Sequence, residues 1–366
     1  GEYTPAAVVK GILEFLKKYG PTLIDNENLP ALVRPDGEKP NSISAVIPAE
    51  VVHARPPSFC TGCPERPIFT ALKLAERETG SHHISADIGC HLFSILPPFN
   101  IGATTMGYGL GAAGASALSD PTSDKRTISF MGDGGFWHNG LTSGVGNAVF
   151  NESDGVMIVV DNAYSAATGG QDLLSSTAEN TTRSTKHPIE NAVRGIGVKW
   201  VKTVQNTYRV SEMRDLMKEA LTGKARGPKV IIAQSECTLN KQRRVRPEIA
   251  ARIKAGKRVV KERFGIDPDT CTGDHSCIRI NGCPSLTIAP NPDAMRKDPV
   301  ATILHSCVGC GLCGEAAQAA VLCPSFYRSE IISNPNMWDK AKLGIRNIMI
   351  GFLQNGIERR LKGIDV

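Results

Sequence analysis

The distribution of cysteine constrains this chain more than any other feature of its sequence. Eleven cysteines occur in 366 residues, and seven of them lie between positions 271 and 323. Cys60 and Cys63 form a CxxC spacing, and a C-x2-C-x2-C run begins at Cys307. We read no secretory signal in the sequence and expect a reducing, cytoplasmic compartment. There such spacings bind metal or carry out redox chemistry rather than form disulfides.

The composition excludes several other classes of function. With 41% hydrophobic and 21% charged residues, the chain is globular and long enough for two or three domains. The net charge of +6 is mild, and no basic patch is interleaved with aromatic residues, so we expect no nucleic-acid partner. No apolar stretch reaches the roughly 20 residues of a membrane helix. Because the sequence begins with Gly1 rather than Met, we expect it to be part of a longer chain.

The first half of the sequence predicts a helix, a linker and an α/β domain. Residues 5–18 have the pattern of a short amphipathic helix, and the proline-containing stretch 26–58 is typical of a linker, so residues 1–58 form the first segment. In residues 59–240, apolar runs at 127–132, 155–162 and 228–234 alternate with helical stretches. That alternation predicts a parallel sheet.

The second half predicts three further segments. Residues 241–263 hold ten Lys or Arg and two Glu, and near-helical spacing of apolar residues predicts a basic linker helix over 241–265. A docking face for an acidic partner or for coenzyme phosphates is the alternative. Residues 266–330 form a small cysteine-rich unit. Within residues 331–366, Trp338, Ala341, Ile345, Ile348 and Phe352 follow the spacing of an amphipathic helix packed on a neighbour.

One stretch of the α/β domain predicts a site for a diphosphate and Mg²⁺. An apolar strand ends at Gly132-Asp133-Gly134, where the glycines let backbone amides approach an anion, and a helix predicted at 140–150 directs its positive end the same way. A second strand ends just before Asn162. Asp133 and Asn162 supply hard oxygens, which suit Mg²⁺.

An alternative nucleotide site is disfavoured. Gly109, Gly111 and Gly114 match the dinucleotide fingerprint, but we find no convincing strand before them and no acidic residue placed for a ribose. A close-packed Gly/Ala helix is the better interpretation.

The cysteines divide into three sets of four ligands. In a two-cluster ferredoxin, the final Cys-Pro of each run ligates the other cluster. Cys307, Cys310 and Cys313 therefore pair with Cys283, which precedes Pro284. The other set is Cys271, Asp274, Cys277 and Cys323, which precedes Pro324. Cys60, Cys63, Cys90 and Cys237 remain for a third cluster, with structural zinc as the alternative.

Asp274 occupies the position of a cluster ligand. The run CTGDHSC, residues 271–277, has aspartate where a ferredoxin motif has its middle cysteine. Every neighbouring cysteine is already assigned, so we expect carboxylate ligation of iron. The alternative is an aspartate that only lies near a three-iron cluster.

These motifs together resemble the 2-oxoacid:ferredoxin oxidoreductases, with the indolepyruvate branch as the nearest. The GDG segment with Asn162 is similar to the thiamine diphosphate signature, and CTGCPERP, SADIGCHLF, GDGGFWHNG and AATGGQ carry the rest of the resemblance. It implies a thiamine diphosphate-binding α/β domain with a parallel sheet, followed by a small two-cluster ferredoxin-like α+β domain. Thiamine diphosphate supplies carbanion stabilisation, and clusters carry the released electrons outward one at a time.

The resemblance also implies roles for individual residues. The cofactor-binding residues are Gly132, Asp133, Gly134, Asn162, Tyr164, Gly169, Gly170 and Gln171, with Mg²⁺ on Asp133, Asn162 and the Tyr164 carbonyl. Cys60, Cys63, Cys90 and Cys237 hold the cluster nearest the cofactor. His138 is a candidate for substrate or proton handling, or an ordinary residue at a helix start. Arg66 is a candidate for binding the substrate carboxylate, or a structural residue. We expect His82 and His83 to be structural.

The implied activity is oxidative decarboxylation of indolepyruvate or another arylpyruvate with coenzyme A, which gives acyl-CoA, CO₂ and reduced ferredoxin. Pyruvate or branched-chain 2-oxoacids, a non-oxidative decarboxylase, and a pure electron-transfer subunit are the alternatives. Thiamine diphosphate enzymes also use a glutamate from a second, pyrimidine-type domain, and no such domain fits in this sequence. We expect it upstream or in a partner subunit, with further oxidoreductase subunits, so this chain alone should be inactive.

Overall fold

The computed structural model describes residues 5–20, 57–120, 122–178 and 180–362. The chain divides into two compact units, Gly1–Pro57 and Ser58–Val366. In the first unit, helix α1 spans Pro5–Tyr19, as the sequence predicts. Nearly all of the predicted linker, up to residue 56, lies outside the described residues.

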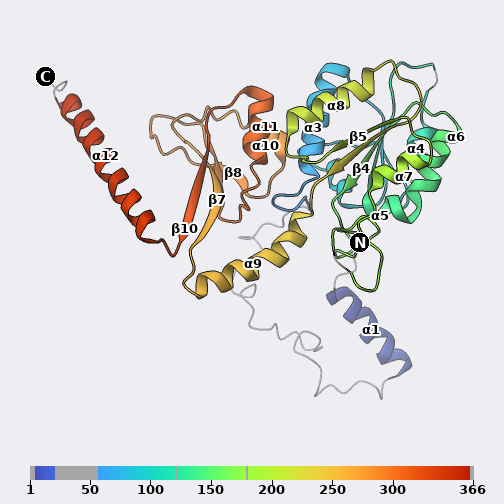
Figure 1. Ribbon diagram of the computed structural model, residues 1–366, viewed down its shortest axis with the longest axis horizontal. Coiled ribbons are helices and arrows are strands. Elements are labelled where there is room, and N and C mark those ends of the chain that lie inside the picture. The colour runs from blue at the N-terminus through green and yellow to red at the C-terminus, as the bar shows by residue number, and fades with distance from the viewer. Residues whose placement is uncertain (1–4, 21–56, 121, 179, 363–366) are drawn as a thin grey trace. The chain divides into compact units, whose positions relative to one another are not determined.

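The second unit begins with a six-stranded parallel sheet in the order β2-β1-β3-β4-β6-β5. Figure 1 shows this sheet among the helices that cover it. Its strands are β1 (Ile84–Ala86), β2 (Thr104–Thr105), β3 (Ile128–Gly132), β4 (Val156–Asp161), β5 (Trp200–Val204) and β6 (Lys229–Gln234). The three predicted strands are confirmed as β3, β4 and β6. The sequence analysis missed β1, β2 and β5, which are short or only partly apolar.

Helices cover both faces of the sheet, so its central strands are buried on both sides. The covering elements are α3 (Arg66–Thr79), η2 (Cys90–Ile95), α4 (Gly111–Ala117), α5 (Asp133–Gly135), η3 (Phe136–Gly146), α6 (Asn147–Phe150), α7 (Ile189–Gly195) and α8 (Val210–Thr222). Val156, Ile158 and Val160 pack with α3 and α8, whereas Met157 and Val159 pack with η3 and α7. This alternation is the two-residue period of a strand, and burial of both faces explains the unbroken apolar run.

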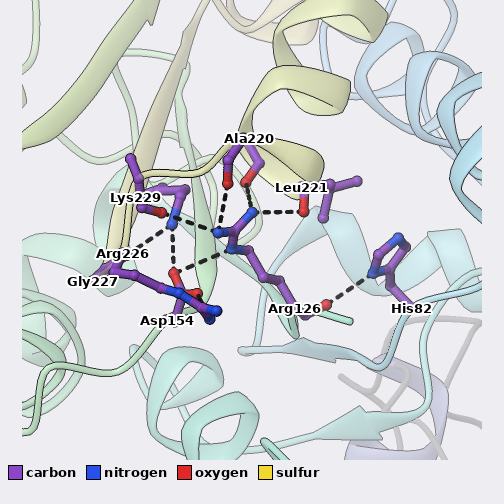
Figure 2. A network of polar contacts seen from close by, with 10 residues as sticks. His82, Arg126, Asp154, Ala220, Leu221, Arg226, Gly227 and Lys229 are labelled. Atoms are coloured by element: carbon purple, nitrogen blue, oxygen red, sulfur yellow. Dashed lines mark hydrogen bonds and ion pairs between the residues drawn. The ribbon is translucent and has the colours of Figure 1, made fainter. Parts of the chain in front are cut away.

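A polar network connects Arg126, Asp154 and Lys229 with the C-terminal end of α8 (Figure 2). Arg126, just before β3, donates hydrogen bonds to the carbonyl oxygens of Ala220 at 3.2 Å and Leu221 at 2.7 Å. Its Nε lies 3.1 Å from Asp154 Oδ1, which also pairs with the buried Lys229 at 2.5 Å. The network satisfies carbonyls at the C-terminal end of α8 that have no partner inside the helix.

His82 and His83 have the structural roles that the sequence predicts. His82 Nδ1 lies 2.9 Å from the Arg126 carbonyl oxygen (Figure 2), and His82 Nε2 lies 3.2 Å from Thr79 Oγ1. His83 Nε2 lies 3.2 Å from Thr104 Oγ1. These contacts fix the entry into β1.

The Gly/Ala stretch packs closely, in agreement with the interpretation that disfavoured a dinucleotide site. A methyl group added to Gly111 would lie 2.8 Å from the Asp87 nitrogen, and one added to Gly109 would lie 2.5 Å from the Gly135 oxygen. Glycine therefore allows α4 to pack closely against the end of β1, and the segment that precedes α4 to pack closely against α5.

The segment after the sheet domain differs from the predicted basic helix. Helix α9 spans Thr238–Lys254, and residues Val259–Ile266 form strand β7. The prediction of a helix continuing through residue 263 is therefore wrong at its C-terminal end. Gly256, at a φ of 71°, follows the last turn, and the β-branched pair Val259 and Val260 favours a strand.

The cysteine-rich part combines two antiparallel strand pairs with two helices. Strand β7 pairs along its whole length with β10, Phe326–Ser333, and β8, Leu286–Ala289, pairs with β9, Val300–Ile303. Helices α10, Ser276–Asn281, and α11, Leu312–Val321, lie between the strands in sequence. Because β7 pairs with β10, this part extends beyond the predicted boundaries at 266 and 330.

The chain ends in helix α12, Met337–Lys362, which confirms the predicted helix but not its packing. Trp338, Ile345 and Phe352 are 77%, 62% and 80% exposed. Arg258 anchors the start of the helix through two contacts with Asp339, at 2.6 and 2.8 Å. In the described parts of the chain, no helix combines the length and apolar character needed to cross a membrane.

Candidate functional site

The proposed diphosphate site is built where β3 runs directly into a helix. Gly132 ends the strand and Asp133 begins helix α5, so the helical segment starts seven residues earlier than the predicted 140–150. The Asp133 side chain is 2% exposed. Its Oδ1 accepts a hydrogen bond from the Gly134 backbone N–H at 2.8 Å, and its Oδ2 accepts one from the Asn162 N–H at 3.0 Å. Asp133 therefore joins the ends of two neighbouring strands.

Asn162 presents a free oxygen beside Asp133. It directly follows β4, is 5% exposed, and its side-chain Oδ1 has no hydrogen-bond partner. Burial, followed by the negative charge of Asp161, raises the pKa of Asp133 well above its usual range. A buried carboxylate and an unpartnered amide oxygen are the hard donors that Mg²⁺ prefers, and a bound cation would offset the cost of burying them. The donor set fits this metal.

These residues line an open cavity of about 580 Å³. Six of the eight predicted cofactor residues line it: Gly132, Asp133, Gly134, Asn162, Tyr164 and Gln171. The Gly134 backbone lies so close to a neighbouring side chain that an added methyl group would be 2.1 Å from the Tyr108 hydroxyl.

Gly169 and Gly170 do not line the cavity. Their φ values of 115° and 92° allow the chain to turn within the loop 165–171. A hydrogen bond from the Ser165 N–H to the Gln171 carbonyl oxygen, at 2.9 Å, closes this loop. Their contribution is to the shape of the loop rather than to the cavity wall, so the structure does not bring them to the site as predicted.

Several residues of the cavity were missed by the sequence analysis. Glu65 is 3% exposed, and burial is the main cause that raises its pKa to about 7. His91 lines the cavity, and Asp87, which does not, contacts His91 at 2.5 Å and accepts a hydrogen bond from the Gly109 N–H at 2.9 Å. Asp87 and His91 are four residues apart in the SADIGCHLF motif. A carboxylate and an imidazole at that spacing within a motif are a signal that could have identified them. Tyr108 has no comparable signal.

Four cysteines meet beside this cavity. Cys60, Cys63, Cys90 and Cys237 line a second, smaller cavity of about 40 Å³, together with Glu65 and Asn162. Cys60 and Cys63 precede α3, Cys90 begins η2, and Cys237 precedes α9. The tertiary structure thus gathers the four residues left over in the cysteine count, despite the distance of Cys237 from the others in sequence.

The remaining seven cysteines all lie in the cysteine-rich part, and one of the two predicted sets lines a common cavity. Cys283, Cys307, Cys310 and Cys313 line one cavity of about 20 Å³. Burial raises the pKa of Cys277 to about 11, and the neighbouring Cys323, Cys271 and Asp274 also influence it. All eleven cysteines are free. Among the described residues, no group of three or more His, Cys, Asp or Glu could hold a single metal ion. An iron–sulfur cluster is larger than one ion and needs four thiolates around a common space, and two of the predicted sets line such a space.

Asp274 is near its predicted set but has another partner. It is exposed, and its Oδ1 and Oδ2 accept hydrogen bonds from the Ser276 N–H at 3.0 Å and the Ser276 hydroxyl at 3.2 Å. These contacts hold Ser276, the first residue of α10. Iron ligation by Asp274 stays a prediction.

The two candidate catalytic residues do not line the cofactor cavity. His138 is exposed, and its ring centroid lies 5.3 Å from that of Tyr108, which does line the cavity. Arg66 is fully buried and points toward α10, where its Nη1 lies 2.5 Å from Asn281 Oδ1. This position does not fit the predicted contact between Arg66 and a substrate carboxylate, because the guanidinium faces the cysteine-rich part instead.

Comparisons with known proteins agree with this arrangement. Residues 87–233 match the family described as "Thiamine pyrophosphate enzyme, C-terminal TPP binding domain". A protein of Pyrococcus abyssi named "Indolepyruvate oxidoreductase subunit IorA" is 30% identical over 279 residues, which are 73% of this chain and 40% of that protein. One with the same name from Methanothermobacter marburgensis is 31% identical over 267 residues, 67% of this chain and 41% of its own.

The chain thus spans about 40% of the length of these curated relatives. Among solved structures, a 2-oxoglutarate:ferredoxin oxidoreductase from Magnetococcus marinus covers 51% of this chain and 66% of its own, at 18% identity and a TM-score of 0.43. That likeness is too weak to support a functional inference.

Proposed function

The chain belongs to the indolepyruvate oxidoreductase family, and on that premise we propose that it is the thiamine diphosphate-binding and electron-carrying part of a 2-oxoacid:ferredoxin oxidoreductase. The proposed reaction consumes an arylpyruvate such as indolepyruvate, coenzyme A and two oxidised ferredoxins. It gives the acyl-CoA, CO₂, a proton and two reduced ferredoxins.

One observation carries the proposal. The cavity at Asp133 and the cavity of four cysteines share a wall, because Glu65, Cys90, Asn162 and Ala166 line both. A non-oxidative decarboxylase needs no electron acceptor beside its cofactor, whereas an oxidative one does. The buried, unpartnered Asn162 oxygen also disfavours a pure electron-transfer subunit, since such a subunit has no use for a metal site there.

Each group of residues has a defined task in this proposal. Asp133 and Asn162, with the Tyr164 carbonyl, would hold Mg²⁺ and through it the diphosphate, and the N-terminus of the helix at Asp133 favours the anion. When bound, thiamine diphosphate supplies the carbanion stabilisation that decarboxylation of a 2-oxoacid requires. Cys60, Cys63, Cys90 and Cys237 would hold the first iron–sulfur cluster, and the two sets of the proposed ferredoxin-like part would hold the others.

The direct test is Mg²⁺-dependent binding of thiamine diphosphate to the anaerobically prepared chain, measured by calorimetry. Asp133→Ala should abolish this binding while the iron content stays unchanged. Asp120→Asn is the control, because Asp120 is an exposed aspartate that does not line the cavity. Normal binding by Asp133→Ala would refute the assignment of the site.

The substrate and the partners are tested by turnover. The chain alone should show no oxidation of 2-oxoacids, and activity should appear when the pyrimidine-type domain or subunit is supplied. A comparison of indolepyruvate, phenylpyruvate, pyruvate, 2-oxoglutarate and a branched-chain oxoacid, with detection of the acyl-CoA, then identifies the substrate class. Equal turnover of all five would contradict an arylpyruvate enzyme.

A further inference from the structure

Arg66 is a buried cation without an acidic partner. It begins α3, three residues after Cys63, and is 0% exposed. Its Nη1 reaches Asn281 Oδ1 at 2.5 Å, whereas its Nε and Nη2 have no hydrogen-bond partner. Among the ion pairs of the described residues, none includes Arg66.

Such an arrangement is unfavourable unless an anion is present. Removal of a charge from water costs several kcal/mol even after relaxation of the protein, and unpaired donors add to that cost. Asn281 offers only a neutral oxygen. The fold therefore retains a charge whose compensating group must come from the surroundings of the guanidinium.

Those surroundings are cysteines. Arg66 lines the cavity formed by Cys283, Cys307, Cys310 and Cys313. It also begins α3, three residues after Cys63 in the sequence. Cys63 belongs to the set beside the cofactor cavity. The guanidinium thus lies between two of the three cysteine sets, and thiols that bind metal are deprotonated.

We propose that Arg66 is the shared counter-ion of these two iron–sulfur clusters, and that it raises the reduction potential of the cluster at Cys283, Cys307, Cys310 and Cys313. This inference rests on the proposed function. A reduced cluster carries one more negative charge than an oxidised one, so a fixed positive charge nearby stabilises the reduced form. Net charge and hydrogen bonds to sulfur are the protein's means of setting cluster potential. Arg66 is therefore a positioning residue for electron transfer from the first cluster to the second.

The test is a redox titration of the anaerobically prepared chain, monitored by electron paramagnetic resonance, with iron content as a second readout. Arg66→Gln should shift the oxidised-to-reduced equilibrium of the Cys283-containing cluster at least tenfold toward the oxidised form, which is about 59 mV for a one-electron couple. Arg66→Lys, which keeps the charge, should stay near the parent potential. The cluster at Cys271, Cys277 and Cys323 should be unaffected.

A matched control is Arg279→Gln, because Arg279 lies on α10 near Asn281 but is exposed. It should leave all potentials unchanged. If Arg66→Gln takes up no iron while Arg66→Lys takes up the full amount, the need for the charge is supported. If Arg66→Gln keeps the parent potentials, or if both variants lack iron, the counter-ion role is wrong, since shape rather than charge would then matter.

This result is separable from the proposed function. A parent chain without iron, or without Mg²⁺-dependent thiamine diphosphate binding, would contradict the proposed function itself. A parent chain with both, together with an unshifted Arg66→Gln, would contradict only the role of Arg66.

Discussion

Replacement of Arg126 by glutamine should destabilise the sheet domain far more than replacement of Arg226, although both arginines contact Asp154. Arg126 is 9% exposed and Arg226 is 81% exposed. Arg126 also donates to the carbonyl oxygens of Gly223 at 2.8 Å and Ala225 at 3.0 Å, besides those of Ala220 and Leu221 (Figure 2). Its loss therefore leaves four carbonyls and part of the Asp154 carboxylate without a partner.

The magnitude follows from these contacts. Hydrogen bonds to charged groups each contribute about 1.5–3 kcal/mol, but contacts in one network are not additive. The loss of one partner from a buried ionic network costs about 3–5 kcal/mol. With about 2–4 °C of melting temperature per kcal/mol for a domain of this size, Arg126→Gln should lower the melting temperature by about 6–20 °C. Arg226→Gln should change stability by about 0.5 kcal/mol or less, as exposed pairs do.

The assay is thermal unfolding of the anaerobic chain by circular dichroism at one fixed scan rate. Arg126→Lys is a further variant, which keeps the charge but loses the forked geometry, and it should lie between the parent and Arg126→Gln. The reasoning is refuted if Arg126→Gln melts within about 2 °C of the parent, or if Arg226→Gln destabilises the chain equally.

Three further predictions follow from the same contacts. Cys237→Ser should damage only the proposed cluster nearest the cofactor, because the other cysteines that line the cavity of Cys237 are Cys60, Cys63 and Cys90. Electron paramagnetic resonance should show the other two clusters intact, and loss of a second cluster would contradict the grouping. Asp274→Cys should suppress conversion of its cluster to a three-iron form on mild oxidation, since a carboxylate holds iron less tightly than a thiolate. If Asp274→Ala behaves like the parent, Asp274 is not an iron ligand and serves only to hold the start of α10. Burial raises the pKa of Asp154, but hydrogen bonds from Lys229 and Arg126 outweigh that effect, so the pKa is lowered overall. The contribution of Asp154 to stability is therefore present above the pKa that it has in the unfolded chain, and it is lost as the pH falls below about 4. Asp154→Asn should flatten the acid limb of a plot of melting temperature against pH, and an unchanged limb would contradict this assignment.

The sequence alone determined the three central strands β3, β4 and β6 and the meeting of Asp133 with Asn162 at their ends. Apolar runs as long as β4 form strands buried on both faces. Because parallel strands end at one edge, Asp133 after β3 and Asn162 after β4 must meet when these strands are neighbours. The count of the cysteines likewise predicts two groups that the structure brings to common cavities, Cys60, Cys63, Cys90 and Cys237 in one and Cys283, Cys307, Cys310 and Cys313 in the other; the third set stays a prediction.

Other features required the tertiary structure. Val260 and Phe264 follow a helical spacing within the predicted helix 241–265, yet they lie in β7, because β10 supplies backbone partners from more than 60 residues away. Such pairing between distant segments leaves no periodic signal in a local window. The shared wall at Glu65 has the same origin, since it depends on where the loop before α3 packs against the end of β4.

The direction of Arg66 shows the difference most clearly. The motif CTGCPERP marks this residue as important, and a substrate carboxylate is a reasonable partner for an arginine close to a cofactor. The side chain instead points to α10, because α3 packs there and Thr70, one turn later, donates to the Ile280 carbonyl oxygen at 2.7 Å. The sequence determines that a guanidinium is present at position 66, whereas the packing of α3 against α10 decides which groups this guanidinium faces.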